Sequence, residues 1–280
     1  MHLSHVATIA GTNEGPLRAQ RLAAIAVDAH DRLFVLGAKR VQRYSSDRTP
    51  EHEFSVDGSC WSLLTDADYL WIGLKGGICR YDLSGERVGT VIGSDHLGRV
   101  TALAILDDDL FVADATHRAI YRYSRNGERI GEIGAKVNRR GFMIPNGLLD
   151  LARDPNDNTI VVAHSQKSRV ERYNLDGALV DKWGRFGMHA PQDFGGCCNP
   201  TNIATAADGM IAVSEKAPPR IKLYDSKGQF QHVTDTDVFD PNTKNIDLAF
   251  DSRNHLYASD PRRRVVEVFE LTRDESEKSS

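Results

Sequence analysis

Residues 199–230, NPTNIATAADGMIAVSEKAPPRIKLYDSKGQF, contain one complete unit of the fold. Three short runs, TNIATA, MIAVSE and RIKLY, are separated by the turn sequences ADG and KAPP. After Tyr224 a further turn, DSKGQ, leads into another apolar run. Short apolar runs divided by Gly, Asp and Pro are typical of antiparallel strands joined by hairpins. The stretch therefore predicts a unit of up-and-down β-strands.

This unit is repeated along the chain. A short apolar run that ends in an aromatic residue occurs six times, at Tyr44, Tyr81, Tyr123, Tyr173, Tyr224 and Phe269. Successive copies are 37 to 51 residues apart, close to the period of about 40–50 residues that is typical of four-stranded propeller blades. We therefore predict an all-β fold, a six-bladed β-propeller with four strands in each blade.

The sixth unit lacks a fourth strand of its own, because the chain after Phe269 continues into the charged sequence of residues 272–280. Residues 2–10, HLSHVATIA, resemble the fourth strands of the other units. We expect residues 6–9 to lie beside residues 265–269, so that the N-terminal strand closes the ring and protects the sheet edges. The predicted organisation is one propeller domain, residues 1–271, followed by a charged, disordered tail at 272–280.

Composition excludes several classes of protein. The 280 residues are 40% hydrophobic, and their net charge of −4 gives no reason to expect general nucleic-acid binding. Four cysteines are too few for a secreted disulfide framework. No apolar run approaches the roughly 18 residues that span a bilayer, and the first residues lack the pattern of a signal peptide. We therefore expect no membrane association and, by default, a cytoplasmic protein.

The repeated pattern resembles the NHL-repeat family of six-bladed β-propellers. Residues 199–230 and 240–271 carry the resemblance, and weaker copies extend it over nearly the whole chain. It implies the propeller fold but no single function, because such propellers include RNA-binding, protein-binding and enzymatic members.

A second resemblance concerns Pro145-Asn146-Gly147, which is similar to a segment of the gluconolactonase-like, metal-dependent hydrolases. In those propellers the asparagine binds a divalent metal, so the resemblance implies that Asn146 is a metal ligand. Asp150, Asn202 and Asp247 are further candidate oxygen ligands near inner strands. The first unit has no early Glu in LAAIAVD, which departs from the hydrolase pattern. A divalent metal is the one cofactor that the sequence suggests, and a metal-dependent hydrolase or lactonase is the alternative function.

One face of the predicted ring carries the long loops that join one blade to the next. We call it the top face. Its loops contain 19 Lys and Arg against 10 Asp and Glu, which favours anions. Arg139, Arg140 and Lys216 are candidate ligand-binding residues there. The sequence predicts binding of a small or anionic ligand at the top of the central channel, and a scaffold for RNA or protein is a further alternative.

Several top-face basic residues have a second interpretation. Arg40, Arg169, Arg220 and Arg264 recur at the start of the third strand of a unit. A recurrent position of this kind is also expected for residues that brace neighbouring blades. The sequence alone leaves both interpretations open.

Cys197 and Cys198 are adjacent in a top loop that leads into the fifth blade, so we expect them near the channel mouth. Neighbouring Cα atoms are about 3.8 Å apart, below the usual disulfide range of about 4.4–6.8 Å. A bond between them would be a strained platform for a ligand. Alternatively, free thiolates would bind a soft metal with His164 or His189, or two reduced cysteines would simply pack.

Asn199 directly follows the cysteine pair, and Asn202 and Asn146 lie near the same face. With Cys197 and Cys198 they complete the set of candidate ligand-binding residues. Cys60 and Cys79 lie in strands, and we expect them in the core.

Three histidines, His117, His164 and His189, fall at top loops or at the ends of second strands. Histidine titrates near neutral pH and is a common general base. These residues are the candidates for catalysis, although no sequence motif of a known catalytic site accompanies them. Whether the protein is an enzyme stays open at this point.

Overall fold

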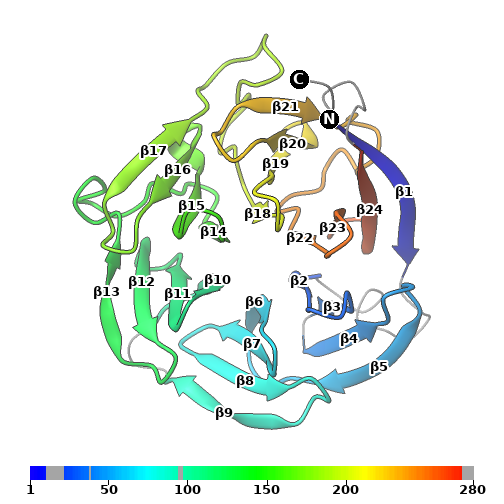
Figure 1. Ribbon diagram of the computed structural model, residues 1–280, viewed down its shortest axis with the longest axis vertical. Coiled ribbons are helices and arrows are strands. Elements are labelled where there is room, and N and C mark those ends of the chain that lie inside the picture. Colours follow the sequence, from blue (N-terminus) through cyan, green and yellow to red (C-terminus); the bar gives the residue numbers. More distant parts are fainter. Residues whose placement is uncertain (11–21, 38, 94–96, 273–280) are drawn as a thin grey trace.

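The computed structural model describes residues 1–10, 22–37, 39–93 and 97–272. Six antiparallel sheets of four strands surround a central axis, and each sheet is one blade (Figure 1). The six-bladed propeller predicted from the repeat is confirmed. The loop residues 11–21, 38 and 94–96, together with residues 273–280 of the predicted tail, lie outside the described part of the chain.

The first three blades follow the chain order from the axis outward. Blade 1 comprises β2 (Ala24–Val27), β3 (Leu33–Leu36), β4 (Arg40–Tyr44) and β5 (Pro50–Ser55). Blade 2 comprises β6 (Cys60–Thr65), β7 (Tyr69–Leu74), β8 (Ile78–Asp82) and β9 (Arg87–Ile92). Blade 3 comprises β10 (Val100–Leu106), β11 (Asp109–Asp114), β12 (Ala119–Ser124) and β13 (Arg129–Ile133).

The remaining blades contain the closing strand. Blade 4 comprises β14 (Asp150–Asp154), β15 (Thr159–His164), β16 (Arg169–Tyr173) and β17 (Leu179–Trp183), with the 3-10 helix η1 (Ser165–Lys167) between β15 and β16. Blade 5 comprises β18 (Ile203–Thr205), β19 (Ile211–Lys216), β20 (Pro219–Tyr224) and β21 (Phe230–Val233). Blade 6 comprises β22 (Leu248–Phe250), β23 (His255–Asp260), β24 (Val265–Thr272) and β1 (His2–Ala10).

Closure of the ring depends on β1, which pairs with β24 (Figure 1). Ala10 lies opposite Val265 and Ile9 opposite Val266, with a bulge between His5 and Ala7. The fully buried Glu267 accepts a hydrogen bond from Thr8 Oγ1 at 2.6 Å, and His5 Nε2 lies 2.7 Å from the same carboxylate. The predicted closure is therefore confirmed, and it is secured by side chains as well as by the backbone ladder.

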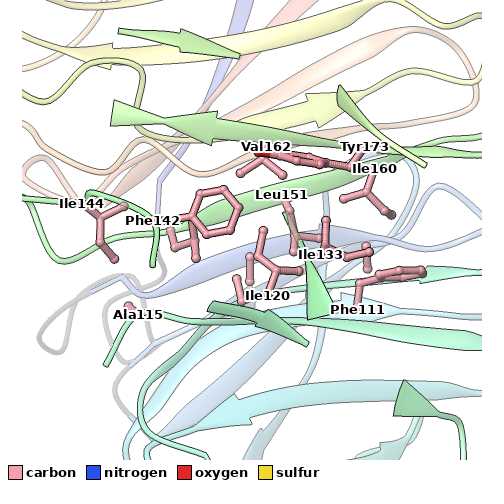
Figure 2. Packing of buried hydrophobic residues seen from close by; sticks show 14 of the residues in the cluster. Phe111, Ala115, Ile120, Ile133, Phe142, Ile144, Leu151, Ile160, Val162 and Tyr173 are labelled. Atoms are coloured by element: carbon pink, nitrogen blue, oxygen red, sulfur yellow. The ribbon is translucent and has the colours of Figure 1, made fainter. Parts of the chain in front are cut away.

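The core is divided among the blade interfaces. The described residues form six buried apolar clusters, one between each pair of neighbouring blades. Figure 2 shows the cluster between blades 3 and 4, where Phe111 and Ile120 face Leu151 and Ile160. Because a blade is covered on both faces, its middle strands are apolar at successive positions and do not alternate.

The cysteines of blade 2 belong to this core. Cys60 and Cys79 are buried free thiols in the cluster between blades 1 and 2, as expected from the sequence. No helix in the described part of the chain has the length and apolar content needed to cross a membrane.

The closing strand yields a stability prediction. Leu3 on β1 is buried against residues of blades 5 and 6, whereas Val6 on the same strand is exposed. Leu3→Ala should lower the free energy of unfolding by about 2–5 kcal/mol, because it removes buried contacts from the closing strand. Val6→Ala should change it by only about 0.5 kcal/mol. Urea unfolding of both variants measures the difference, and equal effects would show that β1 contributes little to the folded ring.

Candidate functional site

The six inner strands enclose a cavity of about 240 Å³ along the central axis. Its wall consists mainly of Ala, Leu, Ile and Val side chains. Asp150, Asn202 and Asp247 line one end, at or just before the starts of β14, β18 and β22, whereas Thr65, Arg153 and Thr205 line the cavity near the ends of inner strands. Each inner strand begins after the loop that enters its blade from the top face. The three polar side chains therefore share the top end of the cavity, and we call them the acidic cluster.

Two members of the acidic cluster also connect neighbouring blades. Asp150 Oδ2 accepts a hydrogen bond from the Ile203 backbone N–H of blade 5 at 2.9 Å. Asp247 Oδ2 accepts one from the Ile25 backbone N–H of blade 1 at 2.7 Å. Both carboxylates therefore hold the ring together at the same place where they line the cavity.

The protonation of the cluster is shifted by its surroundings. Burial raises the pKa of Asp150 well above its ordinary value, and the nearby charge of Asp247 raises it further. Burial also raises the pKa of Asp247, to about 6. At neutral pH the pair therefore tends to keep a proton, which allows a carboxyl group to donate a hydrogen bond as well as accept one.

Asn202 enters blade 5 and so lies between Asp150 of blade 4 and Asp247 of blade 6. Its Nδ2 donates to Asp247 Oδ1 at 3.5 Å, while its buried Oδ1 has no hydrogen-bond donor among the described residues. Buried polar atoms are nearly always hydrogen-bonded, and the exceptions call for an explanation. A bound ligand or ion at the acidic cluster would supply the missing partner.

The fourth candidate metal ligand is not part of this cluster. Asn146 Oδ1 accepts weak hydrogen bonds from Leu148 N–H and Ser165 Oγ, both at 3.4 Å, and Asn146 does not line the cavity. Nor do the described residues contain a group of three or more His, Cys, Asp or Glu side chains able to hold a metal ion. The structure thus brings together Asp150, Asn202 and Asp247, and leaves Asn146 apart.

The three candidate histidines are not assembled into one site, and none of them lines the central cavity. His164 is fully buried. Its Nδ1 lies 2.8 Å from Glu171 Oε2, and its Nε2 accepts the Met143 backbone N–H at 3.1 Å. The Nε2 contact therefore attaches the loop before blade 4 to the blade, while the Nδ1 contact joins β15 to β16 within the blade.

The other two histidines are exposed on separate segments. His117 Nδ1 lies 2.6 Å from the buried Asp114 carboxylate, and half of its side chain is exposed. His189 is exposed in the loop between blades 4 and 5. A catalytic role for either residue stays a prediction.

The paired cysteines are free thiols, and no disulfide joins them. Cys197 is exposed and Cys198 is partly buried, with a left-handed backbone at φ 69°. They line a groove of about 460 Å³ together with Ser165, Gln166, Ser168, Phe186 and Gly196. None of these residues lines the central cavity, and the expected position of the cysteines near the channel mouth stays a prediction.

The residues flanking the cysteines hold this loop in place. The fully buried Asn199 donates from Nδ2 to Gly195 O at 2.7 Å and accepts the Lys216 backbone N–H at 2.9 Å. Its amide is thus used within the protein. Lys216 lies close enough to Cys198 for its charge to oppose the effect of burial, which raises the pKa of that thiol.

Several basic residues of the top face form ion pairs with glutamates, so the face carries less free positive charge than the loop count predicts. Arg40 pairs with Glu53 at 2.5 Å, Arg169 donates to Glu171 at 2.9 Å, and Arg220 pairs with Glu215 at 2.5 Å. Glu53 and Glu171 belong to strands that a count over loops omits, whereas Glu215 is already among the ten acids of that count. Arg139 and Arg140, by contrast, are exposed and form no ion pair in the described part of the chain.

Sequence reasoning missed Trp61, which lines the cavity near the start of β6, across the ring from the start of β18. The Arg99 guanidinium lies 4.7 Å from the centre of its ring and also donates to Gly147 O at 2.5 Å. In the sequence, Trp61 lies within the apolar run CWSLLT, residues 60–65, which resembles the other first strands. Aligning the starts of all six first strands would have placed it near Thr101 and Asp150 around one opening.

Comparisons with solved structures place the fold among β-propellers. A structural genomics protein of unknown function from Bacteroides thetaiotaomicron has a TM-score of 0.67 at 13% identity, with 96% of this chain and 76% of that chain covered. The WD40 β-propeller domain of Doa1 has a TM-score of 0.64 at 12% identity, with 98% of each chain covered.

A third similar structure is a catalytically inactive virginiamycin B lyase from Staphylococcus aureus with quinupristin. It has a TM-score of 0.61 at 14% identity, with 94% of this chain and 83% of that chain covered. No protein-family model matches the chain, and no curated protein does. At these identities the similarities show the propeller fold alone.

The acidic cluster yields a prediction about pH. Because the folded-state pKa of Asp247 is about 6, against 3.8 for the free group, the native protein binds a proton that the unfolded chain releases. Stability due to this group therefore falls as pH rises from about 4 to 6. Asp247→Asn removes the effect, so in EDTA the variant should be more stable than wild type at pH 8 by about 1–3 kcal/mol and nearly equal at pH 4.

Denaturant unfolding across this pH range checks the prediction. Asp181→Asn is the matched control, since Asp181 is an exposed carboxylate on the outer strand β17. A difference between Asp247→Asn and wild type that is constant with pH would show that Asp247 titrates normally in the fold.

Proposed function

We propose that this NHL-like propeller binds a small ligand at the top of its central cavity, through Asp150, Asn202 and Asp247. The observation that carries the proposal is the buried Asn202 Oδ1, which lacks a hydrogen-bond donor beside two carboxyl groups. A ligand with hydroxyl or amine groups would donate to this oxygen and to the carboxylates.

The carboxyl groups of the acidic cluster favour a neutral or cationic ligand, whereas the loop charges predicted an anionic one. The polar end of the cavity presents two carboxyl groups, and an anion placed there would meet like charge. Most of the remaining wall is apolar and includes Trp61, although Thr65, Arg153 and Thr205 line it near the ends of inner strands. A neutral or cationic molecule with a short apolar part therefore fits better than the anionic ligand favoured by the loop charges.

A ligand screen by thermal shift tests this proposal. Small amines, polyols and carboxylates should be compared at pH 7.5, including the four-carbon set of putrescine, erythritol and succinate. Amines or polyols should raise the melting temperature and change Trp61 fluorescence, whereas carboxylates of the same size should not. Ligand affinity should fall at least tenfold in Asn202→Ala, because that variant removes the unfilled acceptor.

Two controls accompany the screen. Asp181→Asn should retain the melting-temperature shift, and Trp61→Phe should lose the fluorescence change while keeping the shift. Stabilisation by carboxylates alone, or binding that survives Asn202→Ala, would contradict the proposal.

A divalent cation is the second candidate ligand, and the same unfilled oxygen favours it. Two carboxylates and one amide oxygen are the donors that Mg²⁺ and Ca²⁺ prefer. Asn146 is not available as a ligand, because its Oδ1 accepts a hydrogen bond from Ser165 Oγ. The three side chains of the acidic cluster would therefore hold the ion, and water would complete its coordination shell. When bound, such an ion would supply the Lewis acid that a hydrolase or lactonase of the gluconolactonase-like type requires.

Calorimetric titration with Mg²⁺ and with Ca²⁺ tests this second candidate. We expect one ion for each chain, with affinity that rises from pH 5 to pH 7 because the ion displaces protons from the carboxyl pair. Asn202→Ala should weaken binding at least tenfold, and Asn146→Ala should leave it unchanged. Failure of both ions to bind at pH 7, or loss of binding only in Asn146→Ala, would exclude the ion site described above.

A further inference from the structure

Exposed apolar side chains are concentrated at the top of blade 4. Eight large hydrophobic residues are exposed in the described part of the chain, and four of them lie in the two loops that flank this blade. These are Val137 and Met143 before β14, and Phe186 and Met188 after β17. Phe186 and Met188 are the most exposed of all, at 65% and 68%. Four exposed apolar residues on neighbouring loops mark an interaction surface.

The exposure of Phe186 and Met188 results from a well-supported loop. Phe194 N–H donates to Arg185 O at 2.9 Å, and the Phe194 ring is fully buried against Tyr224. A side chain at Gly187 would collide with the Asp193 carboxylate. Internal contacts thus fix residues 185–194 and turn two large apolar side chains outward.

The groove that contains Cys197 and Cys198 lies between the loop after β17 and the η1 segment. Phe186 forms part of its wall, and η1 residues Ser165 and Gln166 form another part. Met143 adjoins the η1 side, because its carbonyl accepts the Gln166 N–H at 3.2 Å. We call the groove, together with Val137, Met143, Phe186 and Met188, the blade-4 rim.

The charge beside the rim is positive. Residues 134–149 contain Lys136, Arg139 and Arg140 and no Asp or Glu. All three basic side chains are exposed. Asp193, in the loop after β17, forms an ion pair with Arg185. The buried Glu215 of β19 forms an ion pair with Arg220. An acidic partner would thus meet uncompensated positive charge here.

From these observations we propose that the blade-4 rim docks an acidic peptide segment of a protein partner, with an apolar side chain seated beside Phe186 and Met188. Protein interfaces are enriched in Met, Phe and Arg, the residue types that this rim exposes. Single-stranded RNA requires several aromatic rings for base stacking, and the rim exposes one, Phe186. This surface is separate from the central cavity, so its function does not depend on the acidic cluster.

Selection of phage-displayed random dodecapeptides on the immobilised full chain tests the proposal. Selected peptides should be acidic and share one Leu, Phe or Met. A fluorescein-labelled copy of the consensus should bind wild type and lose at least tenfold in affinity in Phe186→Ser with Met188→Ser. Arg139→Glu with Arg140→Glu should have a similar effect. Bound peptide should also slow alkylation of Cys197, the exposed thiol in the groove.

Matched controls separate this surface from others. Ile130→Ser with Val180→Ser alters two exposed apolar residues on the outer strands β13 and β17, and it should leave peptide affinity unchanged. Asn202→Ala, which alters the cavity, should also leave it unchanged. The rim variants and the Ile130→Ser with Val180→Ser control should retain the wild-type melting temperature, since their substituted side chains are exposed.

Three results would overturn the proposal. The first is a consensus that is not acidic, or no selected peptide. The second is binding that is insensitive to both rim variants. The third is binding of a fluorescein-labelled oligouridine that depends on Arg139 and Arg140 in the absence of peptide binding, which would assign the surface to RNA.

Discussion

The pairing of β1 with β24 is the interaction on which the rest of the molecule depends, because it turns an open row of sheets into a ring. Only in the closed ring does blade 6 adjoin blade 1, so that the Asp247 carboxylate reaches the Ile25 N–H. The cavity needs all six inner strands for its wall. A single strand at the start of the chain therefore creates the central cavity by positioning residues that are more than two hundred positions apart. Glu267, buried under that strand and bound by Thr8, is part of the same closure.

The acidic cluster combines stability and binding in the same side chains. Asp150 and Asp247 each hold a neighbouring blade through a backbone N–H, yet their burial makes ionisation unfavourable. Buried carboxyl groups with raised pKa values are common at functional sites. The blade-4 rim differs, since its apolar residues stand in solvent while Phe194 and Asn199 beneath them are fully buried. The ring thus has two surfaces of different chemistry: the acidic cluster is polar and enclosed in the cavity, and the blade-4 rim is apolar and exposed.

The fold could be predicted from the sequence because every copy of the repeat ends in an aromatic residue, from Tyr44 to Phe269. A period of this length that recurs six times is compatible with few folds. The same repeat placed Asp150, Asn202 and Asp247 near inner strands, and the structure brings them to one end of the cavity. It could not show that Asn146 turns toward Ser165, since a side-chain rotation leaves no periodic signal. Counting charges over loops also overstated the free positive charge, because Glu53 and Glu171, which lie on strands outside those loops, pair with Arg40 and Arg169. The groove of Cys197 arises from contacts between two loops that vary in length from blade to blade, and these have no counterpart in the repeat.

The register of the closing strand has a mechanical consequence. His2 lies opposite Thr272, so both ends of the described chain meet at the same end of the β1–β24 ladder. A force applied to those two ends would load the pairs one after another, from His2 toward Ala10, instead of shearing all of them together. The ring should thus peel open at low force from a seam within blade 6, while the other five blades still hold their complete sets of strands.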